Sequence, residues 1–401
     1  MTAYRHAVLT PQFLYAALAN FFFFTSANFF TLLPLYIHEQ GGTEVWIGVI
    51  MGVYSVSGIL CQPPVGAWVD RVGRRPFMLL GTSLAALSSA AFLLSASLGL
   101  FLLLRLLQGV ALSLFFVANY TLISTLVPPA RRGWALGIFG SSGLLAGALG
   151  PPVGEWLIRR FGYPAFFLNA TLWALIALAV TLKTPEPERA AGFPPPGRPP
   201  ITIGIGTLPP LPLALGFLFG LGVGTVFTFL PTFAERLGVT HFSLFYTGYA
   251  GAALLVRAVW ANLIDSRGRR AVILPSIFIQ AIAPVLFTLV EVTGPTIPAF
   301  PSLMLVGILA GGAHGFLYPA LLALGMDLTP EVHHGRVVGT SNAVQLAGST
   351  LGAVLFGSVA QGFGYGVMFG LLTFVLTAGT LVSLRLWAAD FTRAAAGPGS
   401  V

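Results

Sequence analysis

The sequence predicts an all-α membrane protein, in which twelve transmembrane helices form two pseudo-symmetric six-helix bundles. Of its 401 residues, 56% are hydrophobic and only 8% are charged, whereas soluble globular proteins carry about 25% charged residues. Apolar stretches of about 20 residues, the length that crosses a bilayer, recur along the whole chain. Short motifs of the first half also return in the second half, which indicates an internal repeat.

Six apolar segments of spanning length lie in each half of the chain. In the first half they cover about residues 12–37, 45–69, 76–97, 99–126, 133–157 and 163–182. In the second half they cover about residues 208–234, 242–264, 271–291, 300–325, 336–360 and 366–387. Glycine and proline inside several of them agree with this prediction, because both are more frequent in membrane helices than in soluble ones.

The segments divide the chain into two bundles joined by a linker. We expect bundles at 1–182 and 208–390, a cytoplasmic linker at 183–207 and a cytoplasmic tail at 391–401. The linker includes Phe193–Pro200, in which five of eight residues are proline. Proline at this density favours extended backbone over helix.

Positive charge is distributed unevenly between the two sides of the expected membrane. With the N-terminus in the cytoplasm, fifteen of the twenty Lys and Arg residues fall in cytoplasmic segments. The positive-inside rule therefore predicts that both termini are cytoplasmic. The net charge of +8 then reflects orientation and contact with anionic lipid headgroups, and we expect no nucleic-acid partner.

A charged loop follows the second segment and returns after the eighth. Its glycine, aspartate and arginine residues are Gly66, Asp70, Arg71, Gly73, Arg74 and Arg75. At an offset of 195 residues, the second copy contains Asp265, Gly268, Arg269 and Arg270. The triplet Phe161–Tyr163 likewise returns as Phe363–Tyr365, at an offset of 202. Because each half holds six segments, the two copies share one orientation, and such a parallel repeat places the substrate path between the halves.

These motifs resemble those of the major facilitator superfamily of secondary transporters, over essentially the whole chain. The charged loop is similar to the superfamily's most widespread motif in both of its copies. Arg105, Gln108 and Gly109 resemble its R-x-x-Q-G motif of the fourth span. The fifth span contains a set that resembles a motif reported mainly in exporters: Gly147, Gly150, Pro151 and Gly154. The sequence departs from that motif at Ala146, where a glycine is often found, and at Glu155, which replaces a second glycine.

The resemblance implies secondary active transport of a small organic solute by alternating access. The sequence as a whole resembles those of small bacterial proton-driven exporters, so we expect efflux in exchange for protons across a bacterial-type inner membrane. A proton-linked importer of a polar or anionic metabolite and a lipid-handling protein of the same fold are the alternatives. We expect a monomer whose partners are its small-molecule substrate, protons and membrane lipids.

The resemblance also implies that the charged loop acts as a gate. It places Asp70 against the start of the eleventh span, where Gly335 and Gly339 admit a close approach. It places Asp265 in the same way near Gly133 of the fifth span. A carboxylate at a helix N-terminus is stabilised by about 0.3–1 kcal/mol. Because these contacts would form only while the cytoplasmic side is closed, they would stabilise that state. The alternative is that the loop only sets the topology.

Four ionisable residues within the apolar segments are candidates for transport chemistry, because charge is costly in lipid. Arg105 lies in the outer part of the fourth segment, within reach of the interface, and has either a transport role or a structural one. Arg257, in the middle of the eighth segment, suits anion binding or charge compensation. An unperturbed histidine titrates near neutral pH, so His314 is a proton carrier, a substrate ligand or a neutral hydrogen-bonded residue. Glu155 is either a coupling carboxylate or a residue of the outer rim.

Amide and aromatic side chains are candidates for the walls of a substrate cavity. In the superfamily, spans 1, 4, 7 and 10 line the cavity, and this placement implies a set of wall residues: Asn20, Asn28, Asn119, Tyr120 and Tyr318. We expect most of the phenylalanines between residues 21 and 30 to face lipid. We expect the small face of the fifth segment to pack against the eighth.

The sequence patterns of common enzymes and metal sites are absent. There is no Walker loop, no H-E-x-x-H pattern and no C-x-x-C pair, so we expect neither enzymatic activity nor a cofactor or bound metal. The chain is expected to move a solute rather than to transform it.

Overall fold

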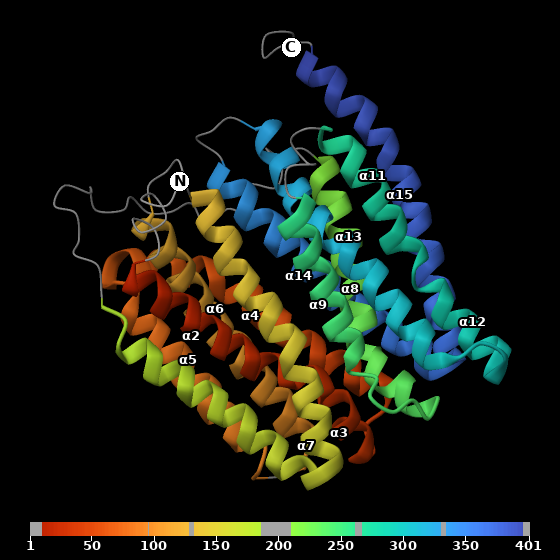
Figure 1. Ribbon diagram of the computed structural model, residues 1–401, viewed down its shortest axis with the longest axis horizontal. Helices are drawn as coiled ribbons and strands as arrows, with labels where there is room; N and C mark the ends of the chain where they lie inside the picture. The colour runs from red at the N-terminus through yellow and green to blue at the C-terminus, as the bar shows by residue number, and fades with distance from the viewer. Residues whose placement is uncertain are drawn as a thin grey trace. The chain divides into compact units, whose positions relative to one another are not determined.

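A computed structural model describes residues 10–94, 96–127, 132–185, 210–260, 267–329 and 334–395, and the regular structure of these residues is helical throughout (Figure 1). Most of the predicted linker and the end of the predicted tail lie outside them. Asp265 and the side chain of Asp70 also lie outside the described part. The gate therefore stays a prediction.

The chain divides into two compact units, each of which is described by itself. Unit 1 consists of Met1–Gln40 and Val53–Ile201, and unit 2 consists of Gly41–Gly52 and Thr202–Val401. The short segment Gly41–Gly52, which we predicted in the N-terminal bundle, thus belongs to unit 2.

Unit 1 contains the helices of the first six predicted spans. They are α2 (Pro11–Phe29), the 3-10 turn η1 (Phe30–Leu32), α3 (Leu33–Glu39), the larger part of α4 (Glu44–Val72), α5 (Arg75–Ala91), α6 (Leu98–Leu126) and α7 (Arg132–Leu182). The elements α2, η1 and α3 together form the first span. The long helix α7 holds the fifth and sixth spans, which meet at Gly162.

Local sequence explains several helix ends in unit 1. Thr10 caps α2, because its Oγ1 accepts a hydrogen bond from the Phe13 N–H at 3.2 Å, and Pro11 stands in the first turn, where its missing N–H costs nothing. Gly73 follows the end of α4 with φ +116°, a conformation that glycine adopts without a steric penalty. Pro76 then lies in the first turn of α5.

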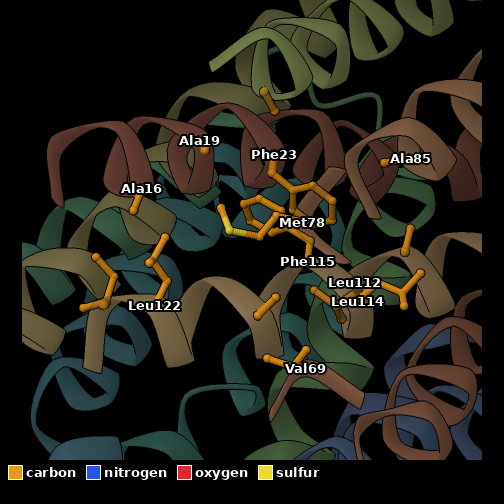
Figure 2. Packing of buried hydrophobic residues seen from close by; sticks show 14 of the residues in the cluster. Ala16, Ala19, Phe23, Val69, Met78, Ala85, Leu112, Leu114, Phe115 and Leu122 are labelled. Atoms are coloured by element: carbon orange, nitrogen blue, oxygen red, sulfur yellow. The ribbon is translucent and has the colours of Figure 1, made fainter. Parts of the chain in front are cut away.

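Unit 1 has a core of aromatic, alanine and branched side chains. Figure 2 shows Phe23 of α2, Met78 of α5 and Phe115 of α6 meeting in this core. The rings of Phe23 and Phe115 stack with their centroids 4.2 Å apart, and Phe29 and Phe30 are also fully buried. The expectation that most of these phenylalanines face lipid is wrong for Phe23, Phe29 and Phe30, since packing against aromatic rings of other helices buries them.

Unit 2 contains the helices of the last six predicted spans. They are α8 (Pro210–Arg236), α9 (Leu244–Trp260), α11 (Arg269–Ile282), α12 (Val285–Thr293), the 3-10 turn η4 (Gly294–Thr296), α13 (Ala299–Asp327), α14 (His334–Phe363) and α15 (Tyr365–Ala395). The ninth span is divided at Pro284 into α11 and α12. Figure 1 shows α15 running beside α11 and α12.

The twelve predicted spans all correspond to helices. Within the described residues, nine helical stretches are long and apolar enough to cross a membrane. One of them, Phe139–Leu182, holds two predicted spans. The helices α5 and α9 have 17 residues each in the described part, and α5 ends at Ala91 rather than near residue 97. The predicted fold class, an all-α membrane protein with a two-fold repeat, is confirmed.

The repeat in the sequence is also a repeat of backbone conformation. Gly73 and Gly268, which are 195 residues apart, have φ of +116° and +83°. Gly162 and Gly364, which are 202 residues apart, have φ of +78° and +85°. A residue with a Cβ atom adopts such values only at a cost. Glycine at both copies therefore lets the helices end or break at matching places in the two units.

A pair of alanine substitutions tests the conformational role of Gly364. Gly364→Ala is expected to lower the free energy of unfolding by about 1–2 kcal/mol, because the residue has φ +85° and a Cβ atom is strained there. Gly362→Ala is the matched control, since Gly362 is helical and has open space around its Cα. It should leave stability unchanged or raise it slightly. Thermal unfolding in detergent measures both, and equal effects would contradict the assignment.

Close backbone contacts explain why the first turns of α4 belong to unit 2. A Cβ atom at Gly48 would clash with the carbonyl oxygen of Ala353 in α14, and one at Gly357 would lie 2.7 Å from the carbonyl oxygen of Glu44. The Tyr365 hydroxyl lies 3.4 Å from Glu44 Oε1. These glycines let two helix backbones touch, which the apolar pattern of α4 alone does not indicate.

Candidate functional site

A line of glycines brings α13 against α9 in unit 2. Gly307, Gly311 and Gly315 follow one another at every fourth position, so they share one face of α13. A Cβ atom at Gly311 would clash with the carbonyl oxygen of Tyr249, and one at Gly315 would lie 2.8 Å from the carbonyl oxygen of Ala253. Small residues permit such backbone contact between membrane helices. This contact decides which side chains of the two helices meet.

The polar cluster of unit 2 lies at this contact and consists of Tyr249, Arg257, His314 and Tyr318. The Tyr249 hydroxyl and His314 Nδ1 are 2.6 Å apart and form a hydrogen bond, whose direction depends on the tautomer of the ring. The Tyr318 ring centroid lies 6.3 Å from that of His314. The ring of Phe219 in α8 contacts the same imidazole in an edge-to-face arrangement, with the two ring centroids 4.9 Å apart. His314 thus stands among aromatic rings with a single tyrosine partner at Nδ1.

Arg257 lies in the last turn of α9 that the structure describes. Its Nε atom is buried and has no hydrogen-bond partner among the described residues. It is within electrostatic range of Tyr249, Tyr318 and His314. None of the ion pairs in the described part of the chain includes it. The predicted site residues Arg257, His314 and Tyr318 are therefore brought together, and Arg257 has no carboxylate beside it there.

The matching place in unit 1 holds a different set of residues. A Cβ atom at Gly109 would clash with the carbonyl oxygen of Tyr54, so α6 approaches α4 as α13 approaches α9. Arg105 is only 5% exposed, its guanidinium lies 4.2 Å from the centroid of the Tyr54 ring, and its Nη1 donates to Gln108 Oε1 at 3.0 Å. The expectation that Arg105 reaches the membrane interface is wrong, because ring and amide together hold it inside the bundle.

Each unit has a small cavity beside this helix contact. The cavity of unit 1 has a volume of about 20 Å³ and is lined by Tyr54, Arg105 and Gln108 among others. The cavity of unit 2 has a volume of about 10 Å³ and is lined by Tyr249 and Gln280 among others. Either volume suits about one water molecule. The Gln280 Oε1 atom is buried without a partner among the described residues, which makes the unit 2 cavity polar on one side.

The predicted wall residues of unit 1 do not form one surface. Asn20 is 2% exposed and Asn119 is fully buried. Asn20 Nδ2 donates to Ser142 Oγ at 2.8 Å, and Asn119 Nδ2 donates to the Ala16 carbonyl at 3.1 Å. These amides join neighbouring helices of the bundle, which argues for a structural role. Tyr120 is partly buried against other aromatic rings.

The small face of the fifth span packs on α2. A Cβ atom at Gly150 would lie 3.1 Å from Asn28 Cβ and 3.2 Å from the carbonyl oxygen of Thr25, and one at Gly147 would lie 3.6 Å from Asn28 Oδ1. Asn28 Nδ2 itself donates to the Phe24 carbonyl one turn earlier. Gly154 contacts other side chains of unit 1. Within unit 1 the partner of this face is thus the first span, whereas we had predicted the eighth.

Unit 2 repeats this packing. Gly352, 202 residues after Gly150, would place a Cβ atom 2.6 Å from the carbonyl oxygen of Leu221 and from Thr225 Oγ1 in α8. The glycine motif of the fifth span therefore serves the same helix contact as its counterpart in the eleventh. This contact lies within each unit and explains the glycines without reference to the direction of transport.

Glu155 has a counter-charge next to it. Its Oε1 accepts from Arg159 Nε at 2.8 Å, and the Glu155 side chain is 4% exposed while the Arg159 side chain is 46% exposed. The two residues are one helical turn apart, which is the usual spacing of such pairs. This ion pair favours a structural role for Glu155 over proton coupling.

The charged loops contain residues that bind helix ends. Arg75 Nη2 donates to the Leu182 carbonyl at 2.7 Å, where the last carbonyls of α7 lack partners within the helix. In unit 2, Arg269 Nε lies 3.0 Å from Asp327 Oδ2 at the end of α13. The gating role predicted for Gly66, Arg71, Arg74 and Arg270 is not tested by these contacts.

Tyr249 and Gln280 were not among the predicted site residues. The sequence holds one signal for Tyr249, because it lies 195 residues after Tyr54 and both follow the spacing of the charged loop. Gln280 lies in an apolar segment without any repeat partner of its own type, since the residue 195 positions earlier is Ala85. No group of three or more His, Cys, Asp or Glu residues in the described ranges is arranged to hold a metal ion.

The chain is similar to known transporters over most of its length. A family model described as Major Facilitator Superfamily matches residues 15–256 and 212–399. The multidrug resistance protein MdtG of Dickeya zeae is 28% identical over 367 residues, which are 86% of this chain and 88% of that protein. MdtG of Enterobacter lignolyticus is 25% identical, with 86% and 85% of the two chains covered.

Solved transporter structures share the fold. The nucleoside transporter NupG has a TM-score of 0.72 at 15% identity, with 94% of this chain and 99% of that chain covered. The human organic anion transporter MFSD10 has a TM-score of 0.67 at 20% identity, with 93% and 100% covered. At these identities the likeness concerns the fold alone.

Proposed function

The chain belongs to the major facilitator superfamily and is a multi-pass membrane transporter, and we propose that it exports small organic solutes in exchange for protons by alternating access. The observation that carries the proposal is the His314–Tyr249 pair in unit 2. Histidine is the side chain whose unperturbed titration falls near physiological pH. The relatives that bear the name multidrug resistance protein and cover most of the chain support efflux as the direction.

The composition of the spans supports His314 as the proton carrier. Between the ends of the twelve spans, the ionisable residues with a charge or a titration near neutral pH are Arg105, Arg257 and His314. Both arginines stay protonated in proteins, so neither carries a proton through a cycle. Glu155 lies near the end of the fifth span and has Arg159 as its partner. His314 is thus the group that can gain and lose a proton.

The proposal includes the setting of the transporter. We place it as a monomer in a bacterial-type inner membrane, with both termini in the cytoplasm. The orientation rests on the fifteen Lys and Arg residues that this arrangement leaves on the cytoplasmic side.

Proton-linked uptake of an anionic solute is the second candidate. Arg257 has a buried Nε without a partner among the described residues, and a proton on His314 adds a second positive charge nearby. An anion and a proton bound at such a site attract each other, which favours their movement in the same direction. The charges of the polar cluster therefore point to cotransport, while the names of the relatives point to exchange.

Transport in proteoliposomes separates these two functions. Solutes that raise the thermal stability of the purified chain are first tested by counterflow, and then under an imposed pH gradient. Proton exchange predicts that a solute accumulates when the lumen is acidic, and cotransport predicts accumulation when the outside is acidic. Protein-free liposomes and a protonophore are the controls. Accumulation only with an acidic outside, or no gradient response for any solute that shows counterflow, would overturn proton-driven efflux.

A further inference from the structure

Among the described residues of the neighbouring helices, no carboxylate balances the charge of Arg257. The helices α8, α9, α11 and α13 together contain only two acidic residues, Glu235 and Asp327, and both lie at helix ends. Asp327 is paired with Arg269 at 3.0 Å. In α12, Glu291 is paired with Arg236 at 3.2 Å. The groups within electrostatic range of Arg257 in the described chain are the two tyrosines and His314, none of which is an acid of carboxylate strength.

An arginine inside a membrane bundle without a counter-ion is costly, and such residues commonly mark a substrate or ion pathway. Arg105 shows how the other unit reduces this cost: a tyrosine ring 4.2 Å away and the Gln108 amide face its guanidinium. For Arg257, no hydrogen bond to Nε occurs among the described residues, and none of the cation–π contacts in that part of the chain includes its guanidinium. The guanidinium of Arg257 thus keeps unused donors, and a guanidinium binds planar oxyanions, carboxylates above all, by two parallel hydrogen bonds.

Aromatic groups surround the remainder of the polar cluster. Phe219 contacts the His314 ring at 4.9 Å, and Tyr318 lies one turn after His314 with its ring centroid 6.3 Å from the imidazole. Aromatic rings offer flat apolar surface together with the hydroxyl of a tyrosine. A cationic solute would meet like charge at Arg257, so this arrangement disfavours it.

We infer that the polar cluster is a binding site for amphipathic organic anions, in which Arg257 binds the carboxylate and the partly exposed rings of His314 and Tyr318 contact an aromatic body. The inference rests on the proposed function in so far as this site takes up the transported solute. It names the class of solute for either direction of transport. An exported anion would also be driven outward by a membrane potential that is negative inside.

Binding of two probes to the purified full-length chain tests the site. The probes are 2-naphthoate and its uncharged analogue 2-naphthamide, which share one ring system and differ in the carboxylate. We expect 2-naphthoate to bind at least about tenfold more tightly than the amide, the ratio that one charge-assisted hydrogen bond supplies. Microscale thermophoresis in detergent, at fixed pH and salt concentration, measures both affinities. Equal affinities, or no detectable binding of 2-naphthoate, would overturn the assignment.

Three variants test whether the preference for the carboxylate probe depends on Arg257. Arg257→Gln is expected to remove the difference between the probes, and Arg257→Lys to keep part of it, because lysine supplies the charge without the planar fork. Arg236→Gln is the matched control in the same unit, since Arg236 already has Glu291 as a partner, and it should keep the full difference. A full preference in Arg257→Gln would overturn the assignment. If Arg257→Gln does not fold, the affinities of the two probes for the unchanged chain still test whether the site prefers a carboxylate.

The binding experiment requires no gradient and no transport. A carboxylate preference that depends on Arg257 supports the site even if the pH-gradient experiment rules out proton exchange. Proton-driven efflux of uncharged solutes, with equal binding of the two probes, would contradict the site and leave the proposed function in place.

Discussion

His314→Gln is expected to abolish the response of solute transport to an imposed pH gradient. In this variant the side chain still offers a hydrogen-bonding group toward the Tyr249 hydroxyl, which lies 2.6 Å from His314 Nδ1, but it no longer titrates. Accumulation under a gradient should therefore fall to the level measured without one, whereas counterflow, which needs no net proton movement, should continue. Proteoliposomes with and without the gradient give both quantities.

Two other substitutions control this experiment. Tyr249→Phe removes the hydroxyl partner of His314 and leaves the imidazole, so the gradient response should persist with an altered dependence on pH. Glu155→Gln should keep the full response, because Glu155 is paired with Arg159 at 2.8 Å and is not proposed to carry the proton. A variant with glutamine at position 314 that still responds fully would exclude His314. Loss of the response in Glu155→Gln alone would transfer the role to Glu155.

Gly311→Ala is expected to destabilise unit 2 and to stop transport. A Cβ atom at this position would clash with the carbonyl oxygen of Tyr249, which belongs to the backbone of α9 and cannot rotate away as a side chain can. Forcing an extra methyl group into such a contact costs about 1–3 kcal/mol. Separation of α9 from α13 would also move His314, three residues further on, away from Tyr249. Thermal unfolding and counterflow measure the two effects.

Gly312→Ala is the matched control for this substitution. Gly312 is the next residue of α13, and a Cβ atom there would lie 3.9 Å from Val256 Cγ2, an ordinary contact distance. Helix propensity favours alanine over glycine by roughly 1 kcal/mol, so stability should stay the same or rise, with transport intact. Similar losses in the two variants would show that helix flexibility, and not the contact with Tyr249, is what Gly311 provides.

Most of the fold follows from local patterns. A run of about 20 apolar residues must form its backbone hydrogen bonds within itself when it enters lipid, so a spanning helix is predicted without knowledge of its neighbours. The repeated triplets mark matching places in the two halves, and their glycines, Gly162 and Gly364, both have positive φ in the structure. Where the prediction differs, the length or the continuity of a helix is affected: α5 ends earlier, and the ninth span is divided at Pro284.

The candidate site was predicted in part. Its ionisable residues, Arg257 and His314, stand out in an apolar background because charge is costly in lipid. Their neighbours do not stand out, since Tyr249 and Gln280 resemble many other residues of the spans. Asn20 and Asn119 stand out in the sequence in the same way, and in the structure each donates a hydrogen bond to another helix of its bundle.

The composition and the pattern of apolar segments establish that the chain spans the membrane, approximately where its helices lie, and that its two halves are repeats. They do so because the bilayer imposes the same requirement on every segment separately. Which face of a helix meets which neighbour depends on contacts between residues far apart in the chain. The sequence of the small face from Gly147 to Gly154 does not indicate which helix covers it. In the structure of unit 1, α2 packs against this face. In the same way, the contact of Gly311 with Tyr249 brings His314 to its tyrosine partner, and only the tertiary structure contains that contact.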